Sequence, residues 1–355
     1  MGCSGDDSSE QQQAGNVPAP SGGVMAPGTA GTPGAATAGG TGDGTAAAPG
    51  DSATTGAGSA TSPGDSTTPP GTGGDPSAGE PMTTEPAMNT AGSSAPPPPP
   101  TGSGCLQPGG GDYLQAGPYT VATVDVSIGS SGMYTIFYPQ PFEEGCGHPI
   151  VAWGNGTGVT GSGTYAFYNE HAASWGVVVV ASHESDVGSG EFHRAGLDYL
   201  LAENENPESM FYQRLSPRAG TSGHSQGGMG ANAGASHPNV EAEVNVQGAF
   251  GGAPAGVSLL CLTGTMDLNP AGCASATAGT SEPAMYANWD GGDHFGTATL
   301  AGFIGGDAGS LQYMRLYAAW FRCFLADDSA ACALFQSPCQ VCGDPGWAEI
   351  EMYNY

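Results

Sequence analysis

The hydrophobic positions after residue 118 fall into short runs with two different periods. Residues 119–127 and 133–138 are rich in β-branched and aromatic side chains and predict an antiparallel hairpin. The run 177–181 is apolar throughout, and 148–153 is largely so, as expected for strands that are covered on both faces. Four further strands are expected at 218–222, 244–247, 257–263 and 284–289.

Between these runs, the apolar side chains repeat every three to four residues. This spacing predicts helices at 165–174, 192–202 and 311–325, and a further helix of small residues that begins at Gln226. Strands that alternate with helices after an antiparallel start are typical of the α/β class. We therefore expect a mostly parallel central sheet with helices on both faces.

The first 104 residues show neither the apolar runs expected of strands nor the three-to-four-residue repeat expected of helices. They contain no Phe, Trp, Tyr, Lys or Arg and consist mainly of Gly, Ala, Ser, Thr and Pro. Such a segment buries too little apolar surface to offset the entropy that is lost on ordering. We expect residues 1–104 to be a long disordered N-terminal tether and residues 105–355 to form one folded domain.

The chain is strongly acidic, with a formal net charge of −28 and only five basic residues, all of them Arg. This charge repels phosphate backbones and argues against nucleic acid as a partner. It also leaves no basic face that would attract anionic lipid. High solubility is the simplest interpretation of the acidity. We expect a monomer.

Cysteine usage indicates the compartment. Eight cysteines follow residue 104, an even set that is typical of an exported, disulfide-bonded domain. A metal site is disfavoured, because the C-x-x-C pair at 339 and 342 has no second pair at zinc spacing. Neighbouring cysteines pair most easily when a turn lies between them, which predicts four local bridges: Cys105–Cys146, Cys261–Cys273, Cys323–Cys332 and Cys339–Cys342.

The ninth cysteine lies at the amino terminus. The chain begins Met1-Gly2-Cys3, which resembles the mature end of a bacterial lipoprotein, where the cysteine carries the lipid. No stretch of about 18 apolar residues could span a membrane, so a lipid on Cys3 would be the membrane contact. The alternative is a Gly-Cys pair that occurs by chance. We expect an extracytoplasmic protein, either secreted or at the bacterial outer membrane.

The candidate chemistry centres on residues 223–227, Gly-His-Ser-Gln-Gly, which match the pattern G-x-S-x-G. A serine on a tight strand-to-helix turn exposes its hydroxyl, and glycines two residues away on each side avoid a collision. The N-terminus of the following helix favours a developing negative charge. Ser225 is therefore the candidate nucleophile. The alternative is a glycine-rich turn with an incidental serine.

A nucleophilic serine needs a base and an acid, and in this arrangement the acid and then the histidine follow it along the chain. His294 is the candidate base, because it lies in a glycine-rich loop after an expected strand and the other histidines come too early. Asp267 is the candidate acid, because it follows the strand expected at 257–263. Glu282 is the reserve for that role.

Two backbone N–H groups are needed to stabilise the oxyanion that forms during acyl transfer. The first candidate is the N–H of Gln226, next after the nucleophile. The second is expected from the glycine-rich loop after the strand 148–153, at Gly156 or Thr157.

These motifs together resemble the α/β-hydrolase superfamily and, within it, the branch of cutinases, polyester hydrolases and lipases. The resemblance rests on residues 223–228, Gly-Thr-Met-Asp at 264–267, Gly-Gly-Asp-His at 291–294 and the early glycine-rich loop, and it covers roughly residues 118–340. It implies the α/β-hydrolase fold and the hydrolysis of carboxylic esters, possible polyesters included, through an acyl-enzyme. It implies neither a cofactor nor a metal.

The resemblance also implies where the substrate binds. Phe250 falls where the branch carries an aromatic residue that lines the acyl cleft, and Trp289 is a second candidate for substrate contact. The branch usually has an aromatic residue in the early oxyanion loop, where this chain has Gly156 and Thr157. That departure favours simple esters over polyesters.

Other interpretations remain open. Residues 183–193 combine two histidines with several acids, but no known metal spacing fits them, and we expect them to lie at the rim of the cleft. The chain could also be a non-catalytic hydrolase-fold domain that binds a ligand or associates with the cell envelope. A peptidase of the same fold is the third possibility, since a catalytic triad alone does not show whether the substrate is an ester or a peptide.

Overall fold

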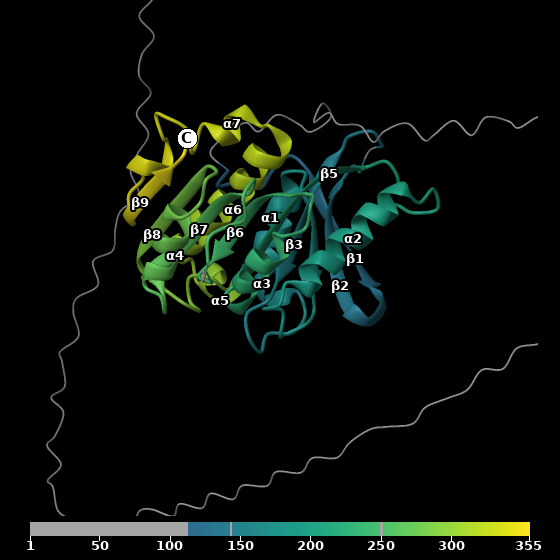
Figure 1. The fold of residues 1–355 in the computed structure, drawn as a ribbon, viewed down its shortest axis with the longest axis horizontal. Coiled ribbons are helices and arrows are strands. Elements are labelled where there is room, and N and C mark those ends of the chain that lie inside the picture. The colour runs from purple at the N-terminus through teal and green to yellow at the C-terminus, as the bar shows by residue number, and fades with distance from the viewer. Residues whose placement is uncertain (1–112, 143, 249–250) are drawn as a thin grey trace, which may run out of the picture. The chain divides into compact units, whose positions relative to one another are not determined.

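A nine-stranded sheet forms the centre of the part of the chain that the computed structural model describes, residues 113–142, 144–248 and 251–355. The strands are β1 (Thr120–Ser127), β2 (Met133–Gln140), β3 (His148–Gly154), β4 (Val178–Ser182), β5 (Leu215–His224), β6 (Val240–Val246), β7 (Ser258–Met266), β8 (Ala284–Asp293) and β9 (Trp347–Tyr353). Their order across the sheet is β1-β2-β4-β3-β5-β6-β7-β8-β9, so that β1 and β9 form the two edges (Figure 1).

The direction of the strands confirms the α/β class. The strands from β4 through β3, β5, β6 and β7 to β8 are paired in parallel. The hairpin of β1 and β2 joins this core antiparallel through β4, and β9 joins it antiparallel through β8. Strands β3 and β4 are buried along their whole length, as their apolar sequences predict.

Helices cover both faces of the sheet. The α-helices of the described residues are α1 (Ala166–Ser174), α2 (Glu191–Glu205), α3 (Gln226–Gly234), α4 (Pro270–Ala278), α5 (Leu300–Ile304), α6 (Ala308–Ala326) and α7 (Ser329–Cys332). Alternate residues of β3 point to opposite faces: Val151 and Trp153 pack in the cluster that holds α1 and α6, and Ile150 and Ala152 pack in the cluster that holds α2. The sheet is thus a middle layer between two helical layers (Figure 1).

The long helix α6 packs close to the sheet because a glycine on β5 leaves space for the side chains of the helix. Tyr317, Trp320 and Phe321 of α6 are fully buried. A Cβ on Gly220 of β5 would lie 2.5 Å from the ring of Phe321, so that a larger residue there would push the helix away. The absence of a side chain at Gly220 therefore lets α6 pack directly against β5, the strand that leads into the G-x-S-x-G motif.

The observed elements differ from the expected ones mainly near the C-terminal end. Strand β9 was not expected, because its two glutamates and the Pro-Gly pair before it hide the strand pattern in the sequence. Helix α4 was not expected either, because its small residues show no apolar period. Its start is nevertheless marked: the side chain of Asn269 accepts a hydrogen bond from the N–H of Gly272, and Pro270 opens the helix.

Three of the four expected disulfides are present. They join Cys261 to Cys273, Cys323 to Cys332 and Cys339 to Cys342. Such bonds persist in oxidising compartments and suggest a protein that acts outside the cytoplasm. The remaining expected bridge, Cys105–Cys146, involves Cys105, which lies outside the described residues, as do the expected tether at 1–104 and the expected lipid anchor at Cys3.

Within the described ranges, every helix is too short or too polar to cross a bilayer.

Candidate active site

Ser225 occupies a sharp turn between β5 and α3. Its backbone is left-handed, with φ 55° and ψ −118°, a conformation that is costly for a residue with a side chain. The N–H of Ser225 donates to the carbonyl of Val246 at 3.0 Å, and its own carbonyl accepts from the N–H of Gly228 at 2.9 Å. The turn is therefore held in place by the neighbouring strand β6 and by the first turn of α3.

The glycines of the motif are required by close contacts between backbones. A Cβ on Gly223 would lie 2.4 Å from the carbonyl carbon of Gly227. A Cβ on Gly227 would lie 2.0 Å from the carbonyl oxygen of Gly154, at the end of β3. This second contact also brings the loop that follows β3 against the start of α3. The physical reason for the pattern G-x-S-x-G is thus visible in the structure.

The three candidate catalytic side chains form one hydrogen-bonded chain. The Nε2 atom of His294 lies 2.9 Å from the Oγ of Ser225, and its Nδ1 atom lies 2.6 Å from the Oδ1 of Asp267. Ser225 follows β5, Asp267 follows β7, and His294 follows β8. Because these strands are parallel, their carboxyl ends all lie on the same side of the sheet. Residues that are distant in sequence therefore come together there.

The carboxylate of Asp267 is fixed on both of its oxygens. Thr263 donates its hydroxyl to Oδ2 at 2.6 Å, and the N–H of Leu268 donates to Oδ1 at 2.6 Å. The Asp267 side chain is only 2% exposed and that of His294 only 7%. A carboxylate held in this way orients the imidazole and stabilises it when it becomes charged. Glu282, the reserve for this role, instead accepts from the N–H of Gly256 at 3.3 Å.

The candidate oxyanion donors lie on the two segments that meet at Gly154 and Gly227. Gln226 is the first residue of α3, and its side chain donates to Asp186 at 2.9 Å. Gly156 is buried, and a Cβ on it would lie 2.8 Å from the hydroxyl oxygen of Tyr165. Thr157 is exposed beside it. The two candidates in this loop therefore differ in exposure, because Gly156 is enclosed by Tyr165 and His224 whereas Thr157 is open to solvent.

The histidines and acids at 183–193 have separate hydrogen-bond partners. Nε2 of His183 lies 2.8 Å from the hydroxyl oxygen of Thr135, and Asp186 accepts a hydrogen bond from the side-chain amide of Gln226. His193 is buried, with Nε2 3.0 Å from the carbonyl of Ser222, and burial lowers its pKa to about 4. No three His, Cys, Asp or Glu side chains gather as metal ligands anywhere in the described ranges.

The pocket at Ser225 is small. Its volume is about 60 Å³. It is lined by Ser225, Gln247, Gly248, Asp267, Leu268, Asn269, Cys273 and His294. Gln247 was not predicted from the sequence; its backbone is left-handed, with φ 53°, and its side chain donates to the carbonyl of Asp293 at 2.9 Å. It therefore ties the end of β6 to the loop that carries His294.

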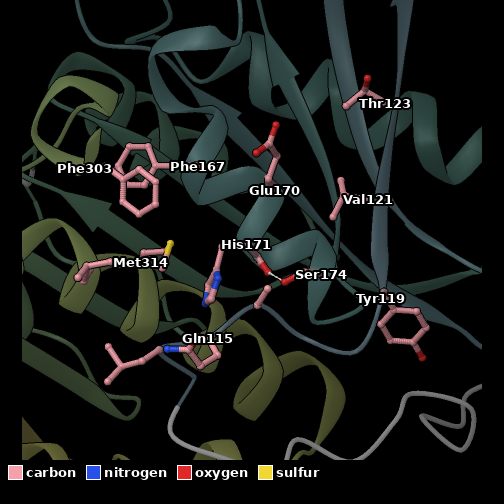
Figure 2. Close-up of a pocket in the computed structure, with 13 residues that line it drawn as sticks. Gln115, Tyr119, Val121, Thr123, Phe167, Glu170, His171, Ser174, Phe303 and Met314 are labelled. Carbon is pink, nitrogen blue, oxygen red and sulfur yellow. Dashed lines mark hydrogen bonds between the residues drawn. The ribbon is translucent and has the colours of Figure 1, made fainter. Parts of the chain in front are cut away.

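A larger cavity of about 780 Å³ lies between β1, α1, α5 and α6 (Figure 2). The rings of Phe167 and Phe303 stack at one end of it, 4.9 Å apart. Its histidine, His171, lies 2.8 Å from the carbonyl of Tyr113, and Ser174 donates to the carbonyl of His171. Among the described residues that line this cavity, Ser174 bonds a backbone carbonyl and no serine hydroxyl is paired with an imidazole, in contrast to the contact between Ser225 and His294.

The structure describes only one of the two residues that were expected to contact the substrate. Phe250 lies outside the described residues. Trp289 does not line the pocket at Ser225; its ring packs edge-on against Trp347 at 5.1 Å, and a Cβ on Gly309 would lie 2.6 Å from it. Its place is therefore between β9 and the start of α6.

Comparison with known protein families gave no match for this chain, and comparison with curated proteins gave none either.

Proposed function

We propose that the chain is a serine hydrolase of the α/β-hydrolase type that cleaves carboxylic esters. The single observation that carries this proposal is the chain of hydrogen bonds from Asp267 through His294 to Ser225, with the serine on a left-handed turn at the carboxyl edge of a parallel sheet. A buried imidazole placed 2.9 Å from a serine hydroxyl is the arrangement that turns a weak nucleophile into a strong one.

The reaction follows from these contacts. The Oγ of Ser225 attacks the ester carbonyl carbon while its proton passes to Nε2 of His294, and the carbonyl oxygen becomes an oxyanion. The imidazolium then gives that proton to the leaving alkoxide, which departs as an alcohol and leaves an acyl-enzyme. Water then attacks the acyl carbon while Nε2 takes its proton, and the imidazolium returns that proton to Oγ as the acyl–Oγ bond breaks, which releases the acid and restores Ser225. Asp267 stays ionised throughout and stabilises the imidazolium.

The oxyanion needs donors that point to one place beside Ser225. The N–H of Gln226 lies next to the nucleophile at the start of α3, where the helix N-terminus favours negative charge. For the second donor we favour Thr157 over Gly156, because Thr157 is exposed beside the site whereas Gly156 is buried against Tyr165 and His224. All the groups in this mechanism belong to the chain itself, so no cofactor is required.

The surroundings of the site favour an ester with an apolar part. Leu268 and Phe295, the residues that follow the acid and the base, are 76% and 66% exposed, and Met266 is 68% exposed. The pocket beside Ser225 is too small to enclose a large acyl group, so such a group would lie on these exposed side chains. Small esters, lipids and polyesters share this chemistry.

The disulfides agree with an enzyme that works outside the cytoplasm. We propose that it is secreted or held at the bacterial outer membrane by a lipid on Cys3, with the first 104 residues as the tether. Mass spectrometry of the protein from a bacterial membrane fraction would detect the diacylglyceryl group on Cys3. An unmodified Cys3 in that fraction would contradict the lipid anchor.

Hydrolysis assays test the proposed function. Wild-type protein should release p-nitrophenol from esters of several acyl lengths, and Ser225→Ala should release none above the rate of water. The matched control is Ser236→Ala, because Ser236 is exposed just beyond α3 and its hydroxyl only bonds a backbone carbonyl. A peptide panel assayed in parallel would identify a peptidase. Equal inactivity of the wild type towards esters and peptides would favour the non-catalytic alternative.

A further inference from the structure

His224, the residue before the nucleophile, has no role in the mechanism above, yet it is buried at the centre of the site. Its exposed fraction is 1%. Its Nε2 lies 2.8 Å from the backbone carbonyl oxygen of His294, and its Nδ1 lies 2.8 Å from the hydroxyl of Tyr165. The imidazole therefore spans the space between two segments that are 59 and 70 residues away from it in sequence.

The partners of the His224 ring define where its proton lies. Burial, together with the neighbouring His294, lowers the pKa of His224 to about 4, so the ring is neutral near pH 7. A carbonyl oxygen only accepts, so Nε2 must carry the proton and donate to His294. Nδ1 is then an acceptor, and the Tyr165 hydroxyl must donate to it.

The contacts continue beyond Tyr165. The hydroxyl of Tyr165, which donates a hydrogen bond to His224, also lies against Gly156 in the loop after β3. A Cβ on Gly156 would lie 2.8 Å from the Tyr165 oxygen and 2.9 Å from Nδ1 of His224, so a glycine is needed there. The relay thus runs from Gly156, which packs against Tyr165, through the hydrogen bonds of Tyr165 and His224 to the carbonyl of His294.

We propose that His224 is a positioning residue that couples the loop of the base, His294, to the loop after β3 that supplies the second oxyanion donor. The inference rests on the proposed function and deepens it. Both loops are rich in glycine and so have little stiffness of their own. A fixed separation between base and oxyanion donor is needed when the tetrahedral intermediate forms, and the relay provides it.

The relay has this effect because it is buried. Tyr165, like His224, is 1% exposed, so water cannot replace a lost partner. Removal of one member leaves a buried polar group without a partner, and the loop that it held can shift to find another. The expected consequence is a slower chemical step with unchanged substrate binding.

The first test is Tyr165→Phe, which removes the hydroxyl and keeps the ring. The matched control is Tyr168→Phe: Tyr168 is also buried and lies against the same Trp153, but among the described residues its hydroxyl has no hydrogen-bond partner. On a soluble ester we expect kcat to fall roughly tenfold in Tyr165→Phe, with KM unchanged, whereas the control keeps the wild-type kcat. Equal kcat values for the two variants would overturn the proposal.

The second test separates a relay from two unrelated contacts. In His224→Leu, the side chain has no polar atom, so it neither donates to the carbonyl of His294 nor accepts from the hydroxyl of Tyr165. The double variant with Tyr165→Phe should then be no slower than the slower of the two single variants, because both remove the same link. Losses in kcat that multiply in the double variant would show independent effects and overturn the relay.

A measurement that does not depend on activity keeps this proposal distinct from the proposed function. Long-range ¹H–¹⁵N spectra of the wild-type protein at pH 7 should show His224 neutral with its proton on Nε2. A proton on Nδ1, or a charged ring, would overturn the relay even in an active enzyme. An inactive wild type with the Nε2 tautomer would instead overturn the proposed function and leave the relay supported.

Discussion

Nδ1 of His294 lies 2.6 Å from Oδ1 of Asp267, across 27 residues of sequence and two neighbouring strands of the sheet. The carboxylate is itself held by Thr263 and by the N–H of Leu268. The imidazole can therefore present only Nε2 to Ser225, which is the orientation that a general base requires. This relationship, more than the serine motif alone, distinguishes the site from an incidental glycine-rich turn.

Asp267→Asn tests this relationship. An asparagine amide can donate to Nδ1, which would place the imidazole proton on Nε2 and block its function as a base. We expect kcat for a p-nitrophenyl ester to fall about 10³–10⁴-fold with little change in the folded structure. The control is Glu282→Gln, whose side chain bonds Gly256 and not His294. An Asp267→Asn variant that keeps most of its rate would show that the acid lies elsewhere.

The Cys261–Cys273 disulfide should support activity as well as stability. Cys273 lines the pocket at Ser225, and the bridge spans the segment that carries Asp267. Replacement of both cysteines by alanine should cost about 2–4 kcal/mol of unfolding free energy and should also lower kcat.

The matched control for that variant is the pair Cys323 and Cys332, which joins α6 to α7 away from Ser225. Its replacement by alanine should lower the Tm without a change in kcat. Urea unfolding and ester kinetics on both double variants check this prediction. The same loss of kcat in both would mean that the disulfide near Asp267 has no special role in catalysis.

Glu243 of β6 should make stability depend on pH. It is fully buried, and burial raises its pKa to about 8, although the amides of Asn232 and Asn245 donate to it. In the unfolded chain the same carboxyl loses its proton near pH 4.5. Between these values the folded state binds more protons than the unfolded state, so the free energy of unfolding must fall as the pH rises.

Glu243→Gln removes this titration. Relative to the wild type, the variant should gain stability steadily from pH 5 to pH 8, at up to about 1.4 kcal/mol per pH unit. Urea unfolding of both proteins at pH 5, 6, 7 and 8 measures the difference. A difference that is the same at all four pH values would show that Glu243 is already ionised in the folded protein.

Deletion of residues 1–104 should leave the kcat/KM for soluble esters unchanged. The segment has no aromatic or basic side chain with which to contact the substrate or the site. Kinetics of the full chain and the shortened chain check this prediction. A large fall in kcat/KM would show that the segment contributes to the active domain.

The sequence predicted the sheet well where apolar runs alternate with helices, and poorly where an element depends on its neighbours. Strands β3 and β4 are predictable because both of their faces are buried. Strand β9 is an edge strand with alternating glutamates, and it becomes a strand through its pairing with β8. Helix α4 consists of small residues, so its sequence carries no period.

The same distinction holds for the site. The structure brings the candidates Ser225, Asp267 and His294 into contact, and the sequence could single them out because the turn, the strand ends and the order along the chain constrain them. Tyr165 and His224 were not linked by the sequence, because their contact joins two segments that only the folded sheet brings together. The sequence suggested that Trp289 contacts the substrate, but in the structure its ring packs between β9 and the start of α6.

The central claim is that Ser225 is an activated nucleophile, and reaction with a fluorophosphonate tests it most directly. Such a probe forms a stable phosphonate ester only with a serine whose proton is taken by a base. The account predicts one adduct per chain, located on Ser225 by peptide mass spectrometry and absent after heat unfolding or in His294→Ala. A native protein that stays unlabelled, or that is labelled at another residue, would contradict it.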